Sequence, residues 1–355
     1  MTFTELSKLR VNSQQIGGSV CKSAAQLVSY LGCVQAQEYA LTKWSLGLRI
    51  SQATDFSIEE EFNKGNILRT HVLRPTWHFV SPADIRWMLK LTAPRVHAAN
   101  AYMYRKVELD AKTFTRSRKI IVKALAAGGY LTRNEIKLVL KKNRIEADGF
   151  RLSYLMMDAE LEELICSGPR AGNQFTYALL EQKAPAMVSF NKQDALRELS
   201  RRYFQSRGPA TLKDFSTWSG LTMTDCKNGL QSLERTLLKE RINDEDYYFV
   251  NQPSQSNKKN KLYLLPVYDK FIMGYKDRSP ALVYKSSLDA KSVFRFNNMI
   301  IDDGQITGTW RRNIEHKDML LECDFFEPLS SKQQIALTHC VNQMSRFSDS
   351  KIIMK

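Results

Sequence analysis

Apolar residues recur at helical spacing in three consecutive segments in the middle of the chain. In the first segment, Ile121 and Leu125 share one face of a predicted helix that ends at a pair of glycines. The second opens with Thr132 followed by Glu135, the spacing of a capping box, and the third is a longer amphipathic helix that stops at Gly168. A strand, a Gly/Pro turn and a second strand follow. Three helices followed by a hairpin are the order of elements in a winged helix. The helices are predicted within 117–129, 130–143 and 151–168, and the hairpin within 165–179.

The same order of elements returns in residues 194–250. A helix ends at Gly208, a short helix begins at Thr211, and a candidate recognition helix and a hairpin with an acidic turn follow. We interpret this region as a second winged-helix unit.

The N-terminal third fits this plan with less regular spacing. Leu27 and Leu31 form one apolar stripe, Trp44 and Leu48 form another, and a third helix is predicted to begin at Ser57. A strand is predicted over 71–80. We therefore predict three tandem winged-helix units, at 1–115, 116–192 and 193–252.

The final third changes to strand-like patterns. Asp303-Gly304 lies between two β-rich runs, which is a strong hairpin signal, and the last predicted helix covers 330–347. A polar linker at 251–260 separates this part from the units before it. The predicted fold class is α+β, with the three units followed by a β-rich domain at 258–355, either an antiparallel sheet or a small, barrel-like sheet, packed on a terminal helix.

The charge balance indicates that this globular protein has a polyanionic partner. The 355 residues include 52 Lys and Arg against 37 Asp and Glu, a net charge of +15. Nucleic acid is the partner that such a basic chain most often meets, although solvated helix faces are the alternative. The excess is greatest over 116–151, where we expect phosphate contacts from Arg116, Arg118, Lys119, Lys141, Lys142 and Arg144.

Composition also restricts the expected cellular location and the kinds of metal and cofactor chemistry that the chain can support. There is no apolar run of transmembrane length and no signal-peptide h-region, so we expect a cytoplasmic, nucleoid-associated protein with no membrane partner. The six cysteines form no C-x-x-C, the five histidines show no ligand spacing, and no phosphate-binding glycine motif occurs. We therefore expect no metal and no cofactor.

The stretch "VQAQEYA" (34–40) places two carboxamides, Gln35 and Gln37, around one alanine. In an extended junction their side chains point to the same side, whereas in the first turn of the following helix Gln37 is simply solvated. Both readings are open from the pattern alone.

Four stretches together resemble the AlkZ-type DNA glycosylases, a tandem winged-helix family that includes the YcaQ-like enzymes. They are "VQAQEYA", "RPTWHFVSPADI", "GPATLKDFSTWSGL", and the pair "LLPVYDKFIMGYKDR" with "DGQITGTWRR". The catalytic motif of the AlkZ-like branch is Gln, an aliphatic residue, Gln, and here small Ala36 takes the middle position. The YcaQ-like branch has Asp where this chain has Gln37.

The resemblance implies a monofunctional DNA glycosylase that hydrolyses the N-glycosidic bond of N7-alkylated purines in double-stranded DNA, and that unhooks N7-linked interstrand crosslinks in some members. Gln35 and Gln37 would be the catalytic residues. An amide cannot act as a general base, but an N7-alkylpurine is already cationic and leaves as a neutral base, so no acid is needed. Positioning of water then remains, and positioning can lower a barrier by about 7–11 kcal/mol.

Several further residues are candidates for supporting roles. Thr76 and His78 alternate on a predicted strand, and His78 would bind a phosphate or orient water, or be a buried histidine. Asp84 follows Ser81 at capping-box spacing, which favours a cap over chemistry. Arg69 and Arg74 flank the strand and would contact phosphates, with surface ion pairs as the alternative.

A non-enzymatic winged-helix transcriptional regulator is the competing hypothesis, and an inactive paralogue is a third. We find no dimerisation module in the sequence and expect a monomer. The pattern does not distinguish a simple N7-alkyl lesion, a bulky adduct and a crosslink, nor self-resistance from general repair.

Overall fold

The N-terminal unit combines helices with a small antiparallel sheet. The computed structural model describes residues 1–355 apart from 19, 185–189, 252–260, 283–296 and 316–317. Its first helices are α1 (Phe3–Ser13), α2 (Ala24–Tyr30), α3 (Tyr39–Gly47) and α4 (Asp55–Lys64). The strands β1 (Cys33–Gln35), β2 (Leu68–His71) and β3 (Trp77–Val80) form a sheet in the order β1-β3-β2.

Two predictions for this unit were wrong in detail. Thr54 caps α4 and the Ser57 side chain completes the capping box, so α4 begins two residues before the predicted start at Ser57. The predicted single strand over 71–80 is instead the end of β2, a turn, and β3, which pair antiparallel. Strand β1 was not predicted.

Helix α5 (Ile85–Lys106) leads into the second unit, whose elements follow the predicted order. Thr132 and Glu135 form the predicted capping box at the start of α7. The predicted boundary between residues 115 and 116 falls inside α6, which begins at Ala111. The elements are α6 (Ala111–Gly128), β4 (Leu131–Thr132), α7 (Arg133–Lys142), α8 (Phe150–Leu161), β5 (Ile165–Ser167), β6 (Thr176–Leu179) and α9 (Leu180–Lys183).

The third unit is compactly packed around aromatic side chains of its first two helices. Phe204, Phe215 and Trp218 are buried together. As predicted, α10 ends at Gly208 and Thr211 caps α11. The elements are α10 (Lys192–Arg207), α11 (Leu212–Ser219), α12 (Met223–Gln231), β7 (Leu238–Ile242) and β8 (Glu245–Phe249).

The C-terminal domain is a sheet covered by one helix, α15 (Ser331–Ser348). Asp303 and Gly304 both have positive φ, 48° and 85°, and form the predicted hairpin turn. The sheet order is β13-β12-β11-β10-β9, so among the described residues β9 and β13 are edges, and the open sheet of our two alternatives is the one observed, with β12 and β13 as a parallel pair. Its strands are β9 (Leu262–Leu265), β10 (Asn298–Asp302), β11 (Gln305–Glu315), β12 (Asp318–Phe325) and β13 (Lys351–Met354).

Other expectations for this domain are tested only in part. Two runs that we expected from the sequence to be strand-like, 281–287 and 292–312, fall partly on residues 283–296, which lie outside the described residues, as does most of the linker at 251–260. Residues 270–273, in a stretch that we expected to be strand-like, form the short helix α13 (Lys270–Met273), and 279–281 form a 3-10 turn.

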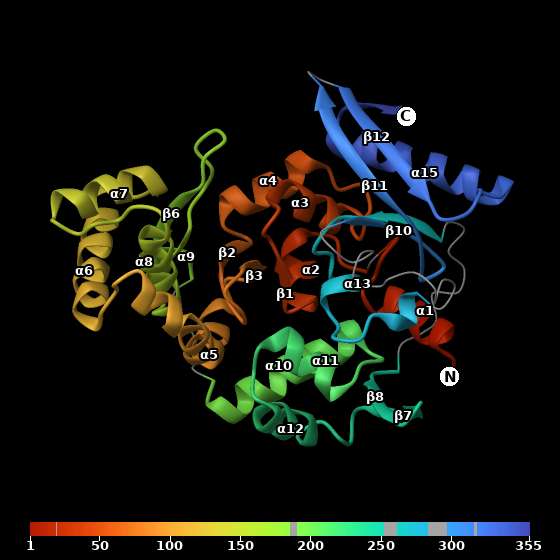
Figure 1. Ribbon diagram of the computed structural model, residues 1–355, viewed down its shortest axis with the longest axis horizontal. Coiled ribbons are helices and arrows are strands. Elements are labelled where there is room, and N and C mark those ends of the chain that lie inside the picture. Colours follow the sequence, from red (N-terminus) through yellow and green to blue (C-terminus); the bar gives the residue numbers. More distant parts are fainter. Residues whose placement is uncertain (19, 185–189, 252–260, 283–296, 316–317) are drawn as a thin grey trace.

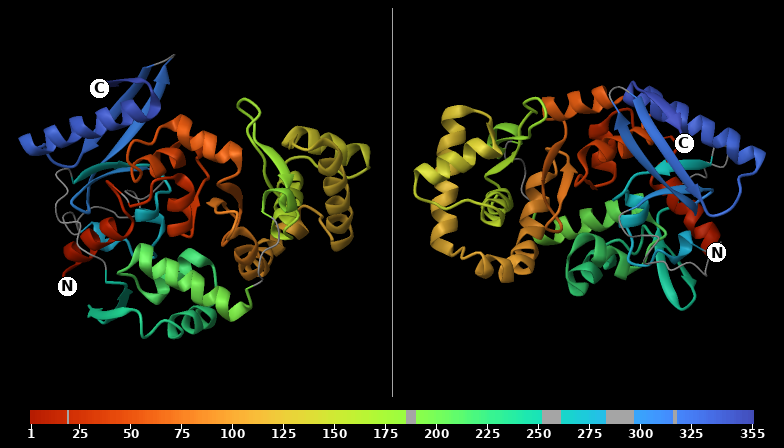
Figure 2. Two further views of the ribbon diagram at one scale, coloured as in Figure 1. Left: turned by 180° about the vertical axis from the view of Figure 1, so that it is seen from behind. Right: turned by 45° about the horizontal axis from the view of Figure 1, so that its top comes forward.

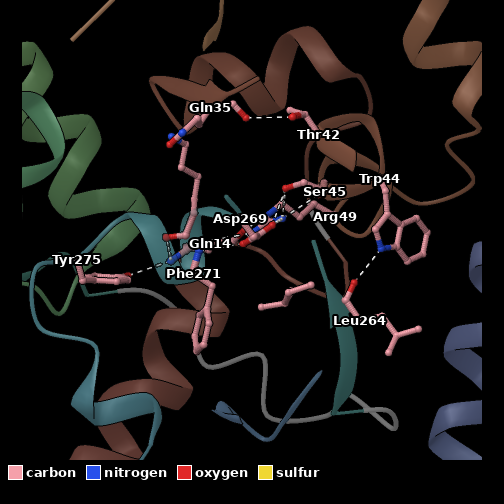
Figure 3. Close-up of polar contacts among 12 residues, drawn as sticks. Gln14, Gln35, Thr42, Trp44, Ser45, Arg49, Leu264, Asp269, Phe271 and Tyr275 are labelled. Carbon is pink, nitrogen blue, oxygen red and sulfur yellow. Dashed lines mark hydrogen bonds and ion pairs between the residues drawn. The ribbon is translucent and has the colours of Figure 1, made fainter. Parts of the chain in front are cut away.

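Helix α3 is joined to the C-terminal domain by buried polar contacts, which Figure 3 shows. Asp269 accepts hydrogen bonds from both terminal nitrogens of Arg49, at 2.8 and 2.9 Å, and from the Ser45 hydroxyl at 2.6 Å. The indole of Trp44 donates to the carbonyl of Leu264 at 2.8 Å. These contacts fix the helix that follows the Gln-Ala-Gln segment against a separate domain.

The units are arranged in an elongated molecule. In Figure 1, α6 and α7 form one end, α15 and β12 form the other, and β1–β3 with α2–α4 lie between them. Figure 2 shows the same separation from two further directions. Among the described residues, no helix combines the length and apolar character needed to cross a membrane.

Candidate functional site

The Gln-Ala-Gln segment lies between β1 and α3. Gln35 is the last residue of β1, and Gln37 lies in a bend two residues before the start of α3 at Tyr39. The prediction that both glutamines lie in a junction outside the helices is therefore confirmed. Their surroundings differ, however, because the Gln35 side chain is 4% exposed whereas Gln37 is exposed to solvent.

Neighbouring elements hold the backbone of this segment at Gln35 and Ala36. The amide of Ala36 donates to the carbonyl of Trp77 at 2.7 Å, and the Ala36 carbonyl accepts from Nε of Arg69 at 3.1 Å. The Gln35 carbonyl accepts from the Thr42 hydroxyl at 3.1 Å, a contact that Figure 3 shows. Because these partners belong to β2, β3 and α3, the junction is fixed rather than loose.

The two carboxamides are each contacted from the turn between β2 and β3. Oε1 of Gln35 accepts from Nη2 of Arg74, and Oε1 of Gln37 accepts from the amide of Trp77, both at 3.4 Å. These contacts are long for hydrogen bonds and constrain the side chains only weakly. Neither oxygen is therefore committed to a strong hydrogen bond within the protein.

The turn that supplies those donors has an unusual backbone. The amide of Arg74 donates to the carbonyl of Val72, and that of Thr76 donates to the carbonyl of Arg74, so two three-residue turns follow each other. Leu73, at the centre of the first, has φ of 65°, which is a strained conformation for a residue with a side chain. Such strain is commonly kept at functional sites.

His78 lies beneath Gln35, its partner across β1 and β3. It is fully buried, its Nδ1 donates to the carbonyl of Thr76 at 2.9 Å, and its Nε2 has no hydrogen-bond partner among the described residues. Burial, together with the neighbouring Lys270 and Arg74, lowers the pKa of His78 well below its usual value. His78 is thus buried, as one alternative expected, and it presents no positive charge to a phosphate.

Asp84 does not have the predicted capping role. The residue precedes α5, but its carboxylate makes no cap hydrogen bond there. It forms a buried ion pair with Arg202 of α10, with oxygen–nitrogen distances of 2.5 and 2.8 Å, and accepts from the Trp87 indole. The capping prediction was wrong because the partner comes from the third unit, and the pair joins the first unit to the third.

The structure places Arg69 in the interior, contrary to the expected phosphate contact. Its side chain is 7% exposed, and the guanidinium lies over the rings of Trp77 and Phe175 at 4.1 and 4.3 Å. Burial lowers the pKa of Arg69 to about 10, so it stays charged. Its role is to hold the Ala36 carbonyl, while Arg74 remains half-buried beside Gln35.

The basic residues of the second unit divide into two groups. Arg118 is paired with Asp158 and Glu162, so it is not free for a phosphate. The others are exposed on α6 and at the end of α7, at the end of the molecule remote from β1 in Figure 1. They are Arg116, Lys119, Lys141, Lys142 and Arg144.

A possible ligand cluster for a metal lies near α8, where His97, Asp158 and Glu162 offer ligand atoms within 4.8 Å of one another. Arg118 lies among these groups, 3.4 Å from Asp158 and 2.6 Å from Glu162. The guanidinium already supplies the positive charge that the carboxylates need, so we assign no metal site there.

Two buried cations near Gln35 were missed from sequence. Lys270 is fully buried, and Arg207 of α10 donates to the carbonyls of Leu31 and Cys33 at 2.8 and 3.2 Å. The charged pair Asp269-Lys270 within the apolar run "LLPVYDKFIMGY" was the available signal. Nothing in the pattern around Arg207 indicated burial.

Comparisons with known proteins agree on one family. The model of the family described as DNA glycosylase AlkZ-like matches residues 28–347. A curated relative from Streptomyces sahachiroi, named interstrand DNA cross-link repair glycosylase, is 21% identical over 309 residues, which cover 81% of this chain and 82% of the relative. The solved structure of Streptomyces sahachiroi DNA glycosylase AlkZ matches with a TM-score of 0.80, 17% identity and full coverage of both chains.

Proposed function

The chain belongs to the DNA glycosylase AlkZ-like family, and from this premise we propose that it hydrolyses the N-glycosidic bond of N7-alkylated purines in double-stranded DNA. It acts as a monofunctional enzyme and as a monomer. The observation that carries the proposal is the Gln-Ala-Gln segment. In it, exposed Gln37 and buried Gln35 flank Ala36, whose backbone is held by Trp77 and Arg69.

The chemistry suits two neutral amides. Hydrolysis of an ordinary glycosidic bond requires a carboxylic acid to protonate the leaving group. A purine alkylated at N7 carries a positive charge and departs neutral, so the enzyme has only to place water against C1′ and to hold the sugar. The oxygens of Gln35 and Gln37 are hydrogen-bond acceptors for that water. An unmodified purine lacks the charge and would stay attached, which provides selectivity.

The buried position of Gln35 gives the two amides different tasks. Gln37 reaches solvent and would meet the sugar and the attacking water first. Gln35 lies behind it, next to Arg74, and would hold the water from the protein side. Crosslinks joined through N7 have the same cationic leaving base, so the proposal extends to unhooking them. The relative from Streptomyces sahachiroi is named as a glycosylase of interstrand DNA cross-link repair.

The test is direct excision by the purified chain. Duplexes that carry one N7-methylguanine, one N7-linked crosslink or only normal bases are incubated with the protein, and abasic sites are scored after alkaline cleavage. We expect strand breaks from the N7-methylguanine duplex, separated strands from the crosslinked duplex, and neither product from normal DNA. An absence of product from both modified duplexes would refute the proposal.

A further inference from the structure

Three buried nitrogen atoms, on residues that interact electrostatically with one another, have no hydrogen-bond partner among the residues that the structure describes. They are Nζ of Lys270, Nε2 of His78 and Nε of Arg74. Lys270 and His78 are both 0% exposed. Buried polar atoms without a protein partner are usually satisfied by ordered water. His78 is the cross-strand partner of Gln35 and Arg74 contacts the Gln35 side chain, so we expect such water on the protein side of Gln35.

The fold brings Lys270 to this position from the C-terminal domain. Its carbonyl accepts from the Gln14 side chain at 3.3 Å, and the preceding residue, Asp269, is locked by Arg49 and Ser45. Figure 3 shows Asp269 and Phe271, which flank Lys270 in the chain, together with Gln35 and Gln14. The backbone of Lys270 is thus held in place, whereas its amine has no hydrogen-bond partner among the described residues.

The charged and titratable groups that face the Lys270 amine come from every element packed around it. They are Cys33 of β1, Arg74 of the turn, His78 of β3, Arg207 of α10 and the adjacent Asp269. Arg74 and Arg207 are cationic and Asp269 is neutralised by Arg49. Burial raises the pKa of the Cys33 thiol, so it stays protonated and uncharged. No carboxylate in this set is left to balance a lysine charge.

An unbalanced buried cation is unstable, and this sets the protonation state of Lys270. Burial first, and then the charges of Arg207 and Arg74, lower its pKa to about 7. Near neutral pH, a large fraction of the lysine is therefore an uncharged amine with a free electron pair. A base is most effective when its pKa lies near the working pH.

Hydrolysis of the glycosidic bond leaves one proton without an acceptor in a site made of amides. A carboxamide does not take up a proton at neutral pH, and the departing base takes only the electron pair of the C1′–N9 bond. On the basis of the glycosylase function proposed above, we propose that Lys270 accepts the proton that the attacking water releases, passed on through ordered water held behind Gln35 by His78 and Arg74. The new C1′–O bond forms, the C1′–N9 bond breaks, the alkylpurine leaves neutral, and Lys270 becomes an ammonium ion that later releases its proton to solvent.

The test is the pH dependence of excision in a single turnover, with protein in excess so that DNA binding does not limit the rate. Between pH 5.5 and 8.5, we expect the wild-type rate on N7-methylguanine to rise about tenfold per unit below the pKa of the lysine and to level off above it. Lys270→Met removes the amine and keeps the length of the side chain. We expect it to lose the rise and to fall by about 10²-fold or more at pH 8.

Matched controls separate this inference from a structural effect and from the glycosylase function itself. Lys43 is also buried but is paired with Asp55 and Glu59, so Lys43→Met should keep the wild-type pH profile. Circular dichroism and DNA affinity show whether Lys270→Met is folded. An excision rate of the wild type that does not change with pH would overturn the role of Lys270. So would a wild-type pH dependence in folded Lys270→Met. If that variant does not fold, the pH dependence of the wild type decides alone. Absence of excision by the wild type at every pH would instead overturn the proposed function.

Discussion

The ion pair between Arg49 and Asp269 is expected to dominate the stability of the contact between α3 and the C-terminal domain. Both side chains are fully buried, and the two terminal nitrogens of Arg49 lie 2.8 and 2.9 Å from the two carboxylate oxygens. Asp269→Ala leaves the guanidinium buried without a counter-charge. Removal of one partner from a buried pair costs about 3–5 kcal/mol, and the Ser45 hydroxyl and the Phe271 amide also lose their acceptor. We therefore expect the free energy of unfolding to fall by about 4 kcal/mol.

Urea unfolding followed by circular dichroism measures this change. The exposed pair Lys64–Glu60 is the control, because Lys64→Ala should cost less than about 1 kcal/mol. In the double variant Arg49→Ala with Asp269→Ala, no unpaired charge remains, so its loss should be clearly smaller than the sum of the two single losses. A loss below 1 kcal/mol for Asp269→Ala, or simple additivity, would contradict the reasoning.

The same pair has a consequence at low pH. Burial alone would raise the pKa of Asp269, but Arg49, the Phe271 amide and Ser45 outweigh it and hold the pKa below the ordinary value of 3.8. A carboxyl whose pKa is lowered on folding contributes stability above its unfolded pKa. That contribution is lost as the pH falls through the folded pKa, so the wild type should lose more stability than Asp269→Ala in this acid range.

Three further predictions concern the DNA-facing function. Arg69→Met should slow excision about tenfold to a hundredfold in single-turnover assays, with little change in DNA affinity. The reason is that Arg69 is buried and holds the Ala36 carbonyl. An equal loss of DNA affinity would show that Arg69 contacts DNA instead. Replacing Lys141, Lys142 and Arg144 together by Gln should flatten the slope of log affinity against log salt by about 0.9 for each lost phosphate contact. The exposed Lys332→Gln variant should leave the slope unchanged, and no change in the triple variant would remove this surface from the DNA interface. Lesion-free duplexes of different sequence should bind within about tenfold of one another in titrations, whereas a preference of about 10³-fold for one sequence would favour a regulator.

The sequence pattern was sufficient for elements whose signals are local. The capping box at Thr132 and Glu135, the glycine after α10 and the Asp303-Gly304 turn depend on neighbours within a few residues, and each was predicted correctly. Strand β1 was missed because it has only three residues and exists through its pairing with β3, more than forty residues later. The choice between an open sheet and a small barrel could not be made for the C-terminal domain, because strand spacing does not reveal which edges pair.

The site shows the same division between local and distant causes. The two glutamines stand out as a motif, but their different burial depends on the turn at Leu73 and on Arg74. Arg69 is buried because Phe175 of the second unit covers it, and Asp84 is an ion-pair partner because Arg202 of the third unit reaches it. A prediction from local residues could not contain these distant partners, so basic and acidic residues near the site were assigned to DNA or to caps.

The most direct test of the account is excision of N7-methylguanine by variants in which each glutamine is replaced by Ala, with the exposed Gln334→Ala on α15 as the control. We predict that Gln35→Ala and Gln37→Ala bind the lesion duplex with wild-type affinity and yield abasic sites at least about 10²-fold more slowly, while Gln334→Ala matches the wild type. Wild-type excision rates in both glutamine variants would contradict the assignment of the site.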